Sequence, residues 1–452
     1  MNLAISKKEL AGIIVLIAIS SFLHLFRLGA PAQPIFDEVH FATYASYYAS
    51  RQGFWDIHPP LGKLIYGGVA KITGVKEPQS FIHFERDDQN RPIIHTANDE
   101  PWNNFPYISL RATSAVAGIL LIPLVFLLAR LLGLGSLPSF LGTLFITFDN
   151  GILLQTRLIL LDGFLLFFGM LGFVLLLLKH VRFFEKQKLL MTVLSALALG
   201  SAGAVKLTGF GFALAVFIAS MAKNEKVNIA PLKKWHFIGL LLIPLFLSFA
   251  IQQILIPFEE ELTYLAVILG TENRGIEFFE SIKTLPFGNV LAIFAAYTAN
   301  VFLTLTAGLS RMSHAAQSTV LGWPLSIKPI PYWIGSSETI SFIGNAALWF
   351  LGFLALVWTV FGKMLRKIVL PPAIHFLLIA WLANVIPYLL ITLIGRPTYL
   401  YHYLPAVIFS SLLLAAIPQN KNFAIVIIGI VLISFILILP LTYGMKFLNF
   451  GN

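Results

Sequence analysis

The chain alternates between long apolar runs and shorter polar segments. Runs of roughly 20 apolar residues, the length that crosses a bilayer as a helix, recur through most of the sequence. We place them at 9–28, 110–132, 137–154, 158–178, 189–205, 208–222, 235–256, 342–361, 370–391, 400–417 and 422–440. The pattern therefore predicts an all-α polytopic membrane protein with about eleven transmembrane helices.

Composition supports a lipid bilayer as the environment. The chain is 58% hydrophobic and only 12% charged, which is too apolar for a soluble protein. It has no cysteine, so disulfides, thiolate nucleophiles and cysteine-ligated metals are excluded. The formal net charge is +10, but the basic residues are scattered at the ends of apolar runs rather than gathered in one patch. We therefore expect no nucleic-acid partner.

The basic residues predict which ends of the helices face the cytoplasm. They cluster before the first run and after the fourth, sixth and eighth runs, and cytoplasmic loops carry such an excess. The residues are Lys7, Lys8, Lys179, Arg182, Lys186, Lys188, Lys223, Lys226, Lys233, Lys234, Lys363, Arg366 and Lys367. The amino terminus is then cytoplasmic, and segment 1–28 is a retained first helix rather than a removed signal peptide.

The same charge pattern divides the chain into five parts. Segment 1–28 is the first helix, 29–109 an external loop, and 110–256 holds helices two to seven. A second external loop follows at 257–341, and 342–452 holds helices eight to eleven with an external tail. Within the second loop, 290–308 is apolar enough to cross, but a single crossing there would turn the Lys363 cluster outward. We predict an interfacial or re-entrant helix at 286–312, and crossing remains the alternative.

The first external loop opens with two adjacent carboxylates, Asp37 and Glu38. Charges at the rim of a membrane span are costly and mark functional sites. The aromatic residues after them recur at helical spacing (Phe41, Tyr44, Tyr47 and Tyr48). This spacing predicts an amphipathic helix that rests on the membrane surface.

A rigid turn follows at His58-Pro59-Pro60, and Gly62 lets the backbone turn tightly before Lys63. Two interpretations remain open for this segment. The turn presents Lys63 to an anion, or the loop is an interfacial helix with anchoring tyrosines and a lysine that extends to lipid headgroups.

FDEVHFATYASYY and DIHPPLGK resemble the signature of the protein O-mannosyltransferase family, membrane glycosyltransferases of GT-C fold. Further family-like segments follow in order along nearly the whole chain. They are YISLRATSAVAG (107–118), FDNGILLQTRLILLDGFLLFF (148–168), AVKLTG (204–209), WPLSIKPIPYW (323–333), IGNAALWFLG (343–352) and GRPTYLYHYLPAVIF (395–409). Segment 257–341 is too short for the MIR domain of eukaryotic members. The chain thus resembles the compact prokaryotic forms, which implies a prokaryotic cell membrane and an extracytoplasmic site.

The resemblance implies an inverting transfer of mannose from a polyprenyl-phosphate carrier to Ser/Thr hydroxyls of secreted or membrane proteins. A hydroxyl needs a carboxylate to take its proton, and Asp37 is our candidate base. Glu38 orients the acceptor or pairs with a cation, and the two roles remain exchangeable between these neighbours. A leaving phosphate needs positive charge.

For that charge we expect Arg111, His402, Arg396, Lys206 and Lys63. Headgroup contact is the alternative for Arg111, Lys206, Arg396 and His402. For the sugar or acceptor we expect His58, Asp162 and Tyr401. The alternative for His58 is that it simply shapes the turn. Asp162 has a second interpretation that we slightly favour, a structural ion pair with Arg157.

We expect no cofactor, no metal and no nucleotide site, because the resemblance implies a metal-independent family and no glycine-rich phosphate loop follows a strand. The partners are then a polyprenyl-phosphate sugar donor, acceptor polypeptides and the bilayer, with homo- or heterodimerisation left open. Two alternatives remain. One is a GT-C transferase acting on a lipid or cell-wall glycan, as aminoarabinose transferases do, and the other is a secondary transporter.

Overall fold

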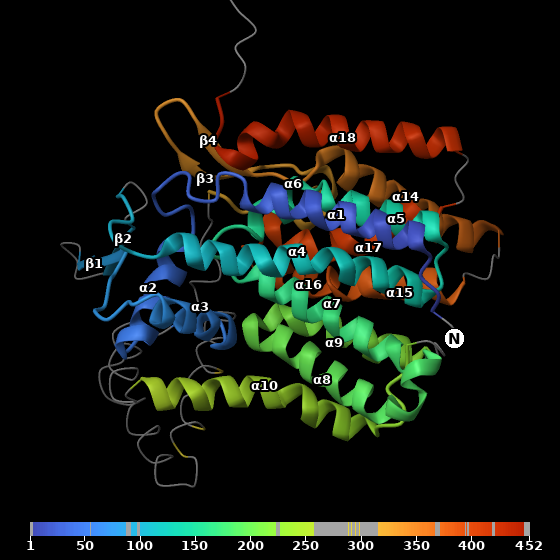
Figure 1. Ribbon diagram of the computed structural model, residues 1–452, viewed down its shortest axis with the longest axis horizontal. Helices are drawn as coiled ribbons and strands as arrows, with labels where there is room; N and C mark the ends of the chain where they lie inside the picture. The colour runs from blue at the N-terminus through green and yellow to red at the C-terminus, as the bar shows by residue number, and fades with distance from the viewer. Residues whose placement is uncertain are drawn as a thin grey trace, which may run out of the picture.

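The computed structural model is a bundle of long helices lying roughly along one direction (Figure 1). It describes residues 3–54, 56–86, 92–96, 100–222, 227–256, 315–366, 371–393, 395, 397–417 and 421–446, with single helical positions at 288, 291, 294 and 298. The predicted helix at 286–312 lies almost entirely outside the described residues, and Arg396 lies outside them as well.

Each predicted apolar run contains a helix, so the predominantly helical fold is as predicted. These helices are α1 Lys7–Leu25, α4 Tyr107–Leu132, α5 Ser136–Thr147, α7 Asp162–Leu178, α8 Lys188–Val205, α9 Phe210–Met221, α10 Lys234–Leu255, α14 Ala346–Arg366, α15 Pro372–Ala383, α17 Leu404–Ala416 and α18 Lys421–Tyr443. Among the described residues, 6 helices are long and apolar enough to cross a membrane, and the others are shorter apolar helices. The number of crossings stays a prediction.

Two of the predicted runs are interrupted. The run at 137–154 divides into α5 and the short α6 (Asn150–Gln155), because Asp149 caps α6 by accepting a hydrogen bond from the Ile152 N–H at 2.7 Å. The run at 370–391 divides into α15 and α16 (Ile386–Leu393). Hydropathy does not detect such caps, so the sequence predicted continuous helices.

The two polar segments meet at one end of the bundle. From the first come α2 (Glu38–Ser50), α3 (Leu61–Ile72) and an antiparallel hairpin of β1 (Ile82–Arg86) and β2 (Pro92–Thr96). From the second come the 3-10 turn η4 (Val320–Leu325) and a hairpin of β3 (Ile330–Ile334) and β4 (Thr339–Phe342), irregular between Pro331 and Trp333. The amino terminus and the α7–α8 turn, with η1 (Arg182–Gln187), lie at the opposite end (Figure 1). The charge pattern predicted this separation of the polar segments from the amino terminus, and which end faces the cytoplasm stays a prediction. Neither strand hairpin was predicted.

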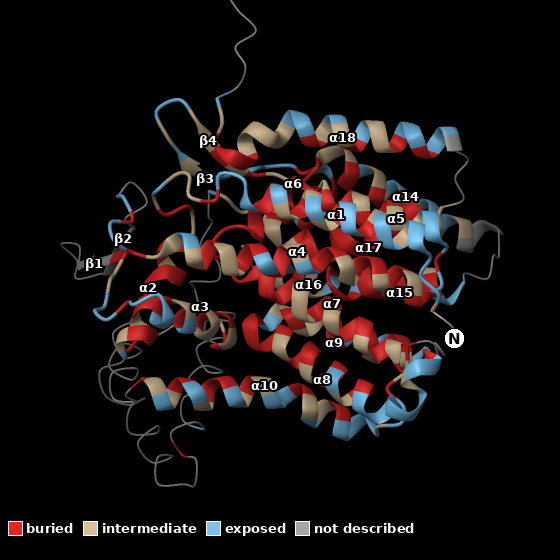
Figure 2. Ribbon diagram, in the orientation of Figure 1, coloured by how far each residue is buried: buried red, intermediate tan, exposed pale blue. Residues whose placement is uncertain are grey.

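Helices at the edge of the bundle expose apolar side chains, as a lipid-facing surface requires. α10 and α18 alternate buried and exposed positions, whereas α17 is buried at every position except its last (Figure 2). Large exposed side chains on the two outer helices include Leu247, Ile254, Ile433 and Leu437. Exposing these apolar side chains to water would be unfavourable, whereas contact with lipid tails has no such cost.

The interfacial helix predicted after Asp37 is instead a buried helix. On α2, Phe41, Tyr44 and Tyr48 are 5%, 7% and 4% exposed. α3 packs along α2, and the Tyr48 hydroxyl donates to the Gln252 side chain of α10. The helical spacing of the aromatic residues was identified correctly, but their side chains contact protein rather than lipid. The prediction was wrong because helical periodicity does not say which partner covers the apolar face.

Candidate active site

The adjacent carboxylates Asp37 and Glu38 have opposite environments. Phe36, just before them, has a φ of 54°, in the left-handed region that bulky residues seldom adopt. Asp37 is the N-cap of α2, yet its side chain makes no capping hydrogen bond. No hydrogen bond reaches the Asp37 carboxylate from the residues that the structure describes, and the residue stays partly exposed. An aspartate at this position normally caps its helix, so its freedom is unusual.

Glu38 is fully buried and accepts four hydrogen bonds. Oε1 accepts from Arg111 Nε at 2.8 Å and from the Ile159 N–H at 2.9 Å. Oε2 accepts from Arg111 Nη2 at 2.6 Å and from the Ile35 N–H at 2.9 Å. Ile159 lies in the buried, non-helical stretch between α6 and α7, where backbone groups need partners. Glu38 therefore joins three parts of the chain and has no capacity left for a substrate.

Arg111 on α4 uses all five of its N–H donors within the protein. Besides Glu38, it donates from Nη1 to the carbonyls of Leu28 and Pro31 and from Nη2 to the Gln33 carbonyl, each at 3.0 Å. The guanidinium group has no further donor. We predicted that Arg111 would hold the lipid phosphate, but the structure gives it a different position. Arg111 holds the backbone at the start of the first polar segment in place and pairs with Glu38.

Burial raises the pKa of the Asp37 carboxyl above its usual value. The positive charges of His40, Lys206 and His58 act against this shift, and the negative charge of Asp162 adds to it. These residues come from three separate parts of the chain. Asp37 is therefore the point at which the predicted site residues converge.

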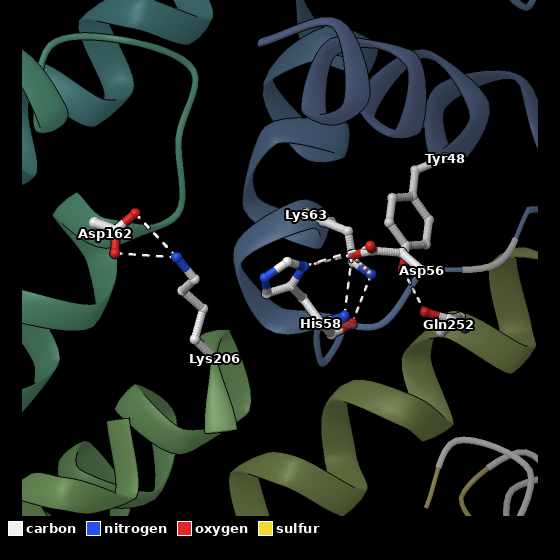
Figure 3. A network of polar contacts seen from close by, with 7 residues as sticks. All are labelled: Tyr48, Asp56, His58, Lys63, Asp162, Lys206 and Gln252. Carbon is white, nitrogen blue, oxygen red and sulfur yellow. Dashed lines mark hydrogen bonds and ion pairs between the residues drawn. The ribbon is translucent and has the colours of Figure 1, made fainter. Parts of the chain in front are cut away.

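Lys206 and Asp162, whose charges both act on Asp37, form an ion pair with each other. Figure 3 shows this pair. Lys206 ends α8 in an extended conformation before the 3-10 turn η2 (Leu207–Gly209), and Asp162 is the first residue of α7. The Lys206 ammonium lies 3.1 Å from both Asp162 carboxylate oxygens and 5.3 Å from the centre of the Tyr401 ring. Three predicted site residues are thus in contact.

Arg157 does not pair with Asp162, so the interpretation that we slightly favoured for Asp162 was wrong. Arg157 instead donates from Nη2 to the Phe26 carbonyl at 2.5 Å and lies over the Tyr443 ring. The two residues are close in sequence, but the non-helical stretch between α6 and α7 turns their side chains to different neighbours. Asp162 pairs with Lys206 instead, and its contact with the sugar or acceptor stays a prediction.

Lys63 is buried in a cluster with Asp56 and His58 (Figure 3). Its ammonium donates to Asp56 Oδ2 and to the His58 carbonyl, both at 2.7 Å. Burial alone would raise the pKa of Asp56, but Lys63 and His58 outweigh it and hold that pKa below its usual range. Lys63 therefore stabilises the turn rather than presenting its charge, whereas the His58 side chain keeps 27% exposure. Gly62 lies inside α3, where a Cβ would meet Leu161, rather than in a tight turn.

His402 belongs to an aromatic cluster next to Tyr401. It lies in the 3-10 turn η5 (Leu400–Tyr403), and the two rings meet edge to face with centres 4.7 Å apart. The backbone N–H of Tyr399 donates to His402 Nδ1 at 3.2 Å. Since Nδ1 accepts, the neutral ring carries its proton on Nε2. The Tyr399 backbone therefore sets the tautomer of the neutral His402 ring.

Three residues in or beside the site were not predicted: Asp56, Gln155 and Tyr332. Asp56 lay within the DIHPPLGK motif, two residues before a histidine, and that spacing was the available signal. Gln155 and Tyr332 gave none, because their contacts depend on segments far apart in sequence. Among described residues, no three His, Asp or Glu side chains are arranged to hold a metal, and metal independence stays a prediction.

Comparison with known proteins relates both halves of the chain to one group. Residues 14–257, more than half of the 452, match the family described as dolichyl-phosphate-mannose-protein mannosyltransferase. Residues 296–450 match the C-terminal four TMM region of protein-O-mannosyltransferase. A curated relative, dolichyl-phosphate-mannose–protein mannosyltransferase 4 of Candida albicans, is 33% identical over 159 residues, which are 35% of this chain. The matched part spans only 20% of that relative.

Solved structures share the fold. A chain of the S. cerevisiae protein O-mannosyltransferase Pmt1-Pmt2 complex bound to the sugar donor superposes with a TM-score of 0.72 at 14% identity, covering 98% of this chain and 91% of that one. ArnT from Cupriavidus metallidurans bound to undecaprenyl phosphate reaches 0.51 at 12% identity, covering 89% and 59%. At such identities the likeness shows the GT-C fold and leaves the roles of individual residues to their geometry.

Proposed function

This chain belongs to the dolichyl-phosphate-mannose-protein mannosyltransferase family, as its motifs predicted, and on that premise we propose that it moves mannose from a polyprenyl-phosphate carrier to protein hydroxyls. The reaction inverts the anomeric carbon. The proposed acceptors are Ser and Thr side chains of secreted or membrane polypeptides. Family membership supports the reaction class, and the arrangement around Asp37 supports the assignment of residues.

One observation carries the proposal: of two adjacent carboxylates, only Asp37 is free to react. Glu38 is saturated by four donors, whereas the Asp37 carboxylate has none among the described residues and remains partly exposed. Its raised pKa brings it nearer to the operating pH, which favours proton transfer. We therefore assign Asp37 as the general base and Glu38 as a residue that maintains the site.

In the proposed step, the acceptor oxygen attacks the anomeric carbon of mannose and its proton passes to Asp37. The bond between that carbon and the phosphate oxygen breaks, and its electron pair leaves with the polyprenyl phosphate. Phosphate is a good leaving group, so a second carboxylic acid is unnecessary. The transition state carries positive charge on the sugar, as in other glycosyl transfers.

The leaving phosphate gains negative charge, and we assign Lys206 and His402 to stabilise it. An ammonium has three N–H donors, and among the described residues the two carboxylate oxygens of Asp162 are the hydrogen-bond acceptors of Lys206. His402, whose ring meets Tyr401 edge to face, is the second residue that we assign to the phosphate. Tyr401 lies between these two side chains and against the Phe36 ring, which suits an aromatic wall for the sugar. His58 is the further candidate for sugar contact.

We place the reaction at the extracytoplasmic face of a prokaryotic cell membrane. The basic turns at the opposite end of the bundle support this orientation. No cofactor is proposed, since the carrier lipid is itself the sugar donor. Whether two copies or two related chains associate is a separate question, and the proposed chemistry uses residues of one chain only.

Transfer by the purified protein tests the proposal. The protein in lipid nanodiscs receives polyprenyl-phosphate-mannose and a Ser/Thr peptide, and an alkali-labile mannosyl peptide is the expected product. Lipid and glycan acceptors and other lipid-linked sugars are supplied in parallel. Product on a lipid or glycan alone would move the chain to the alternative GT-C class, and sugar uptake into vesicles without any transfer would favour a transporter.

A further inference from the structure

Tyr332 contacts both halves of the proposed site. It lies on β3, from the second polar segment, and it is 3% exposed. One side of the residue faces Phe36, the neighbour of Asp37, and its hydroxyl faces the Asp162–Lys206 pair through Gln155. The inference drawn from this rests on the proposed function and deepens it.

The ring and backbone of Tyr332 hold Phe36. The two rings are stacked with centres 4.0 Å apart and planes 2° apart. The Phe36 N–H donates to the Tyr332 carbonyl at 3.0 Å. Phe36 adopts a positive φ, a conformation that persists in a bulky residue only where its surroundings impose it. The contact with Tyr332 supplies that constraint immediately before Asp37, whose carboxylate then does not cap α2.

The hydroxyl of Tyr332 begins a chain of hydrogen bonds with a fixed direction. Asp162 is paired with Lys206 and can only accept, so Gln155 donates to it from Nε2 at 2.9 Å. The Gln155 oxygen Oε1 is then the acceptor for the Tyr332 hydroxyl at 2.7 Å. Lys206 lies 3.1 Å beyond, on the Asp162 carboxylate. No member of this chain can reverse without breaking the ion pair.

We propose that Tyr332 is a positioning residue that fixes the base Asp37 and the ammonium of Lys206 relative to each other. Its ring and carbonyl fix the Phe36–Asp37 backbone, and its hydroxyl fixes the Asp162 carboxylate on which Lys206 rests. Base and phosphate-binding cation must act on opposite sides of one anomeric carbon. Because Tyr332 links the two residues, it sets the distance between the base and the cation. Small displacements of either group from the reacting atoms reduce the rate of transfer strongly.

Two substitutions separate the contact of Tyr332 with Phe36 from the hydrogen bonds of its hydroxyl. Tyr332→Phe keeps the ring stack and removes only the hydroxyl chain, so donor affinity should fall about tenfold while the acid-limb pKa of turnover is retained. Phe36→Leu removes the stack and keeps the hydroxyl chain, so kcat should fall about tenfold with donor affinity retained. Tyr443→Phe is the matched control. It also removes a buried tyrosine hydroxyl, which donates to the Leu23 carbonyl and takes no part in the hydrogen bonds from Tyr332 to Lys206.

Donor binding is measured directly with polyprenyl-phosphate-mannose in nanodiscs, together with kcat and the melting temperature of each variant. Tyr332→Phe is also combined with Lys206→Met. If the hydroxyl acts through Lys206, it has no further effect on donor affinity once Lys206 is gone.

Wild-type donor affinity in Tyr332→Phe, or an undiminished effect in the Lys206→Met background, would overturn the inference while leaving the proposed function intact. A fall in affinity equal to that of Tyr443→Phe would also overturn it. A wild-type protein that neither binds this donor nor transfers its sugar would instead overturn the proposed function and the inference with it.

Discussion

The Arg111 guanidinium and the Glu38 carboxylate form a fully buried, two-point ion pair with N–O distances of 2.6 and 2.8 Å. The pair joins α4 to the start of α2 and leaves neither residue with spare hydrogen-bonding capacity. Charges at a membrane rim are expected to act on ligands. Here the pair supports the backbone instead, and we propose its neighbour Asp37 as the reactive group. On that proposal, adjacent residues with the same chemistry have different roles.

Breaking the Glu38–Arg111 pair should destabilise the protein more than it alters any bound substrate. Arg111→Met leaves a buried carboxylate without its cation, and the expected loss in free energy of unfolding is about 3–5 kcal/mol. Combined with Glu38→Met, the loss should be smaller than the sum of the two single losses by more than about 1 kcal/mol. Denaturation in detergent measures the free energy of unfolding of the two single variants and the double variant. Strictly additive losses would show that the two residues act independently.

Lys206→Met should weaken use of the lipid donor. A hydrogen bond to a charged group contributes roughly 1.5–3 kcal/mol, so KM for the donor should rise roughly 10- to 100-fold. KM for the acceptor peptide should change little. Lys234→Met removes a lysine at the opposite end of the bundle and serves as the control. An unchanged donor KM in Lys206→Met would assign Lys206 to a purely structural pair with Asp162.

The pH dependence of turnover should report Asp37. The base works only when ionised, so activity rises as pH increases through its pKa. Because burial raises that pKa, the acid limb should lie above the usual range of an aspartate. Lys206 lowers the pKa of Asp37, so Lys206→Met should move the limb to still higher pH. A limb that is unmoved in Lys206→Met, or one in the ordinary aspartate range, would contradict the assignment.

The sequence predicted the helices well because apolar runs report burial in lipid directly. It did not predict β3 and β4, whose short strands lie in a segment without a clear alternating pattern. It also missed the break at Asp149, where one carboxylate caps α6 and accepts a 2.7 Å hydrogen bond from the Trp349 indole. Such features depend on partners remote in the chain, which hydropathy does not identify.

The candidate site was predictable in its members but not in their roles. Asp37, Asp162, Lys206 and Tyr401 were all identified, and they do converge. Charge type and position in the chain cannot distinguish a free arginine from one with five occupied donors, so Arg111 was placed at the phosphate. Hydrogen-bond satisfaction is a property of the folded chain, and it is the basis on which we propose Asp37 rather than Glu38 as the base.

The most direct test of the account compares Asp37→Asn with Glu38→Gln. The Asp37 carboxylate has no hydrogen-bond donor among the described residues, and its raised pKa means that burying the charge costs stability, so Asp37→Asn should melt at or above the wild-type temperature. Glu38→Gln should melt lower, because Arg111 loses its counter-charge.

The deciding measurement is the initial rate of mannosyl transfer to a Ser/Thr peptide by folded Asp37→Asn protein at saturating polyprenyl-phosphate-mannose. We predict a fall of about 10²- to 10⁴-fold with donor affinity retained. A variant that stays folded, binds the donor and transfers mannose at the wild-type rate would show that Asp37 is not the base.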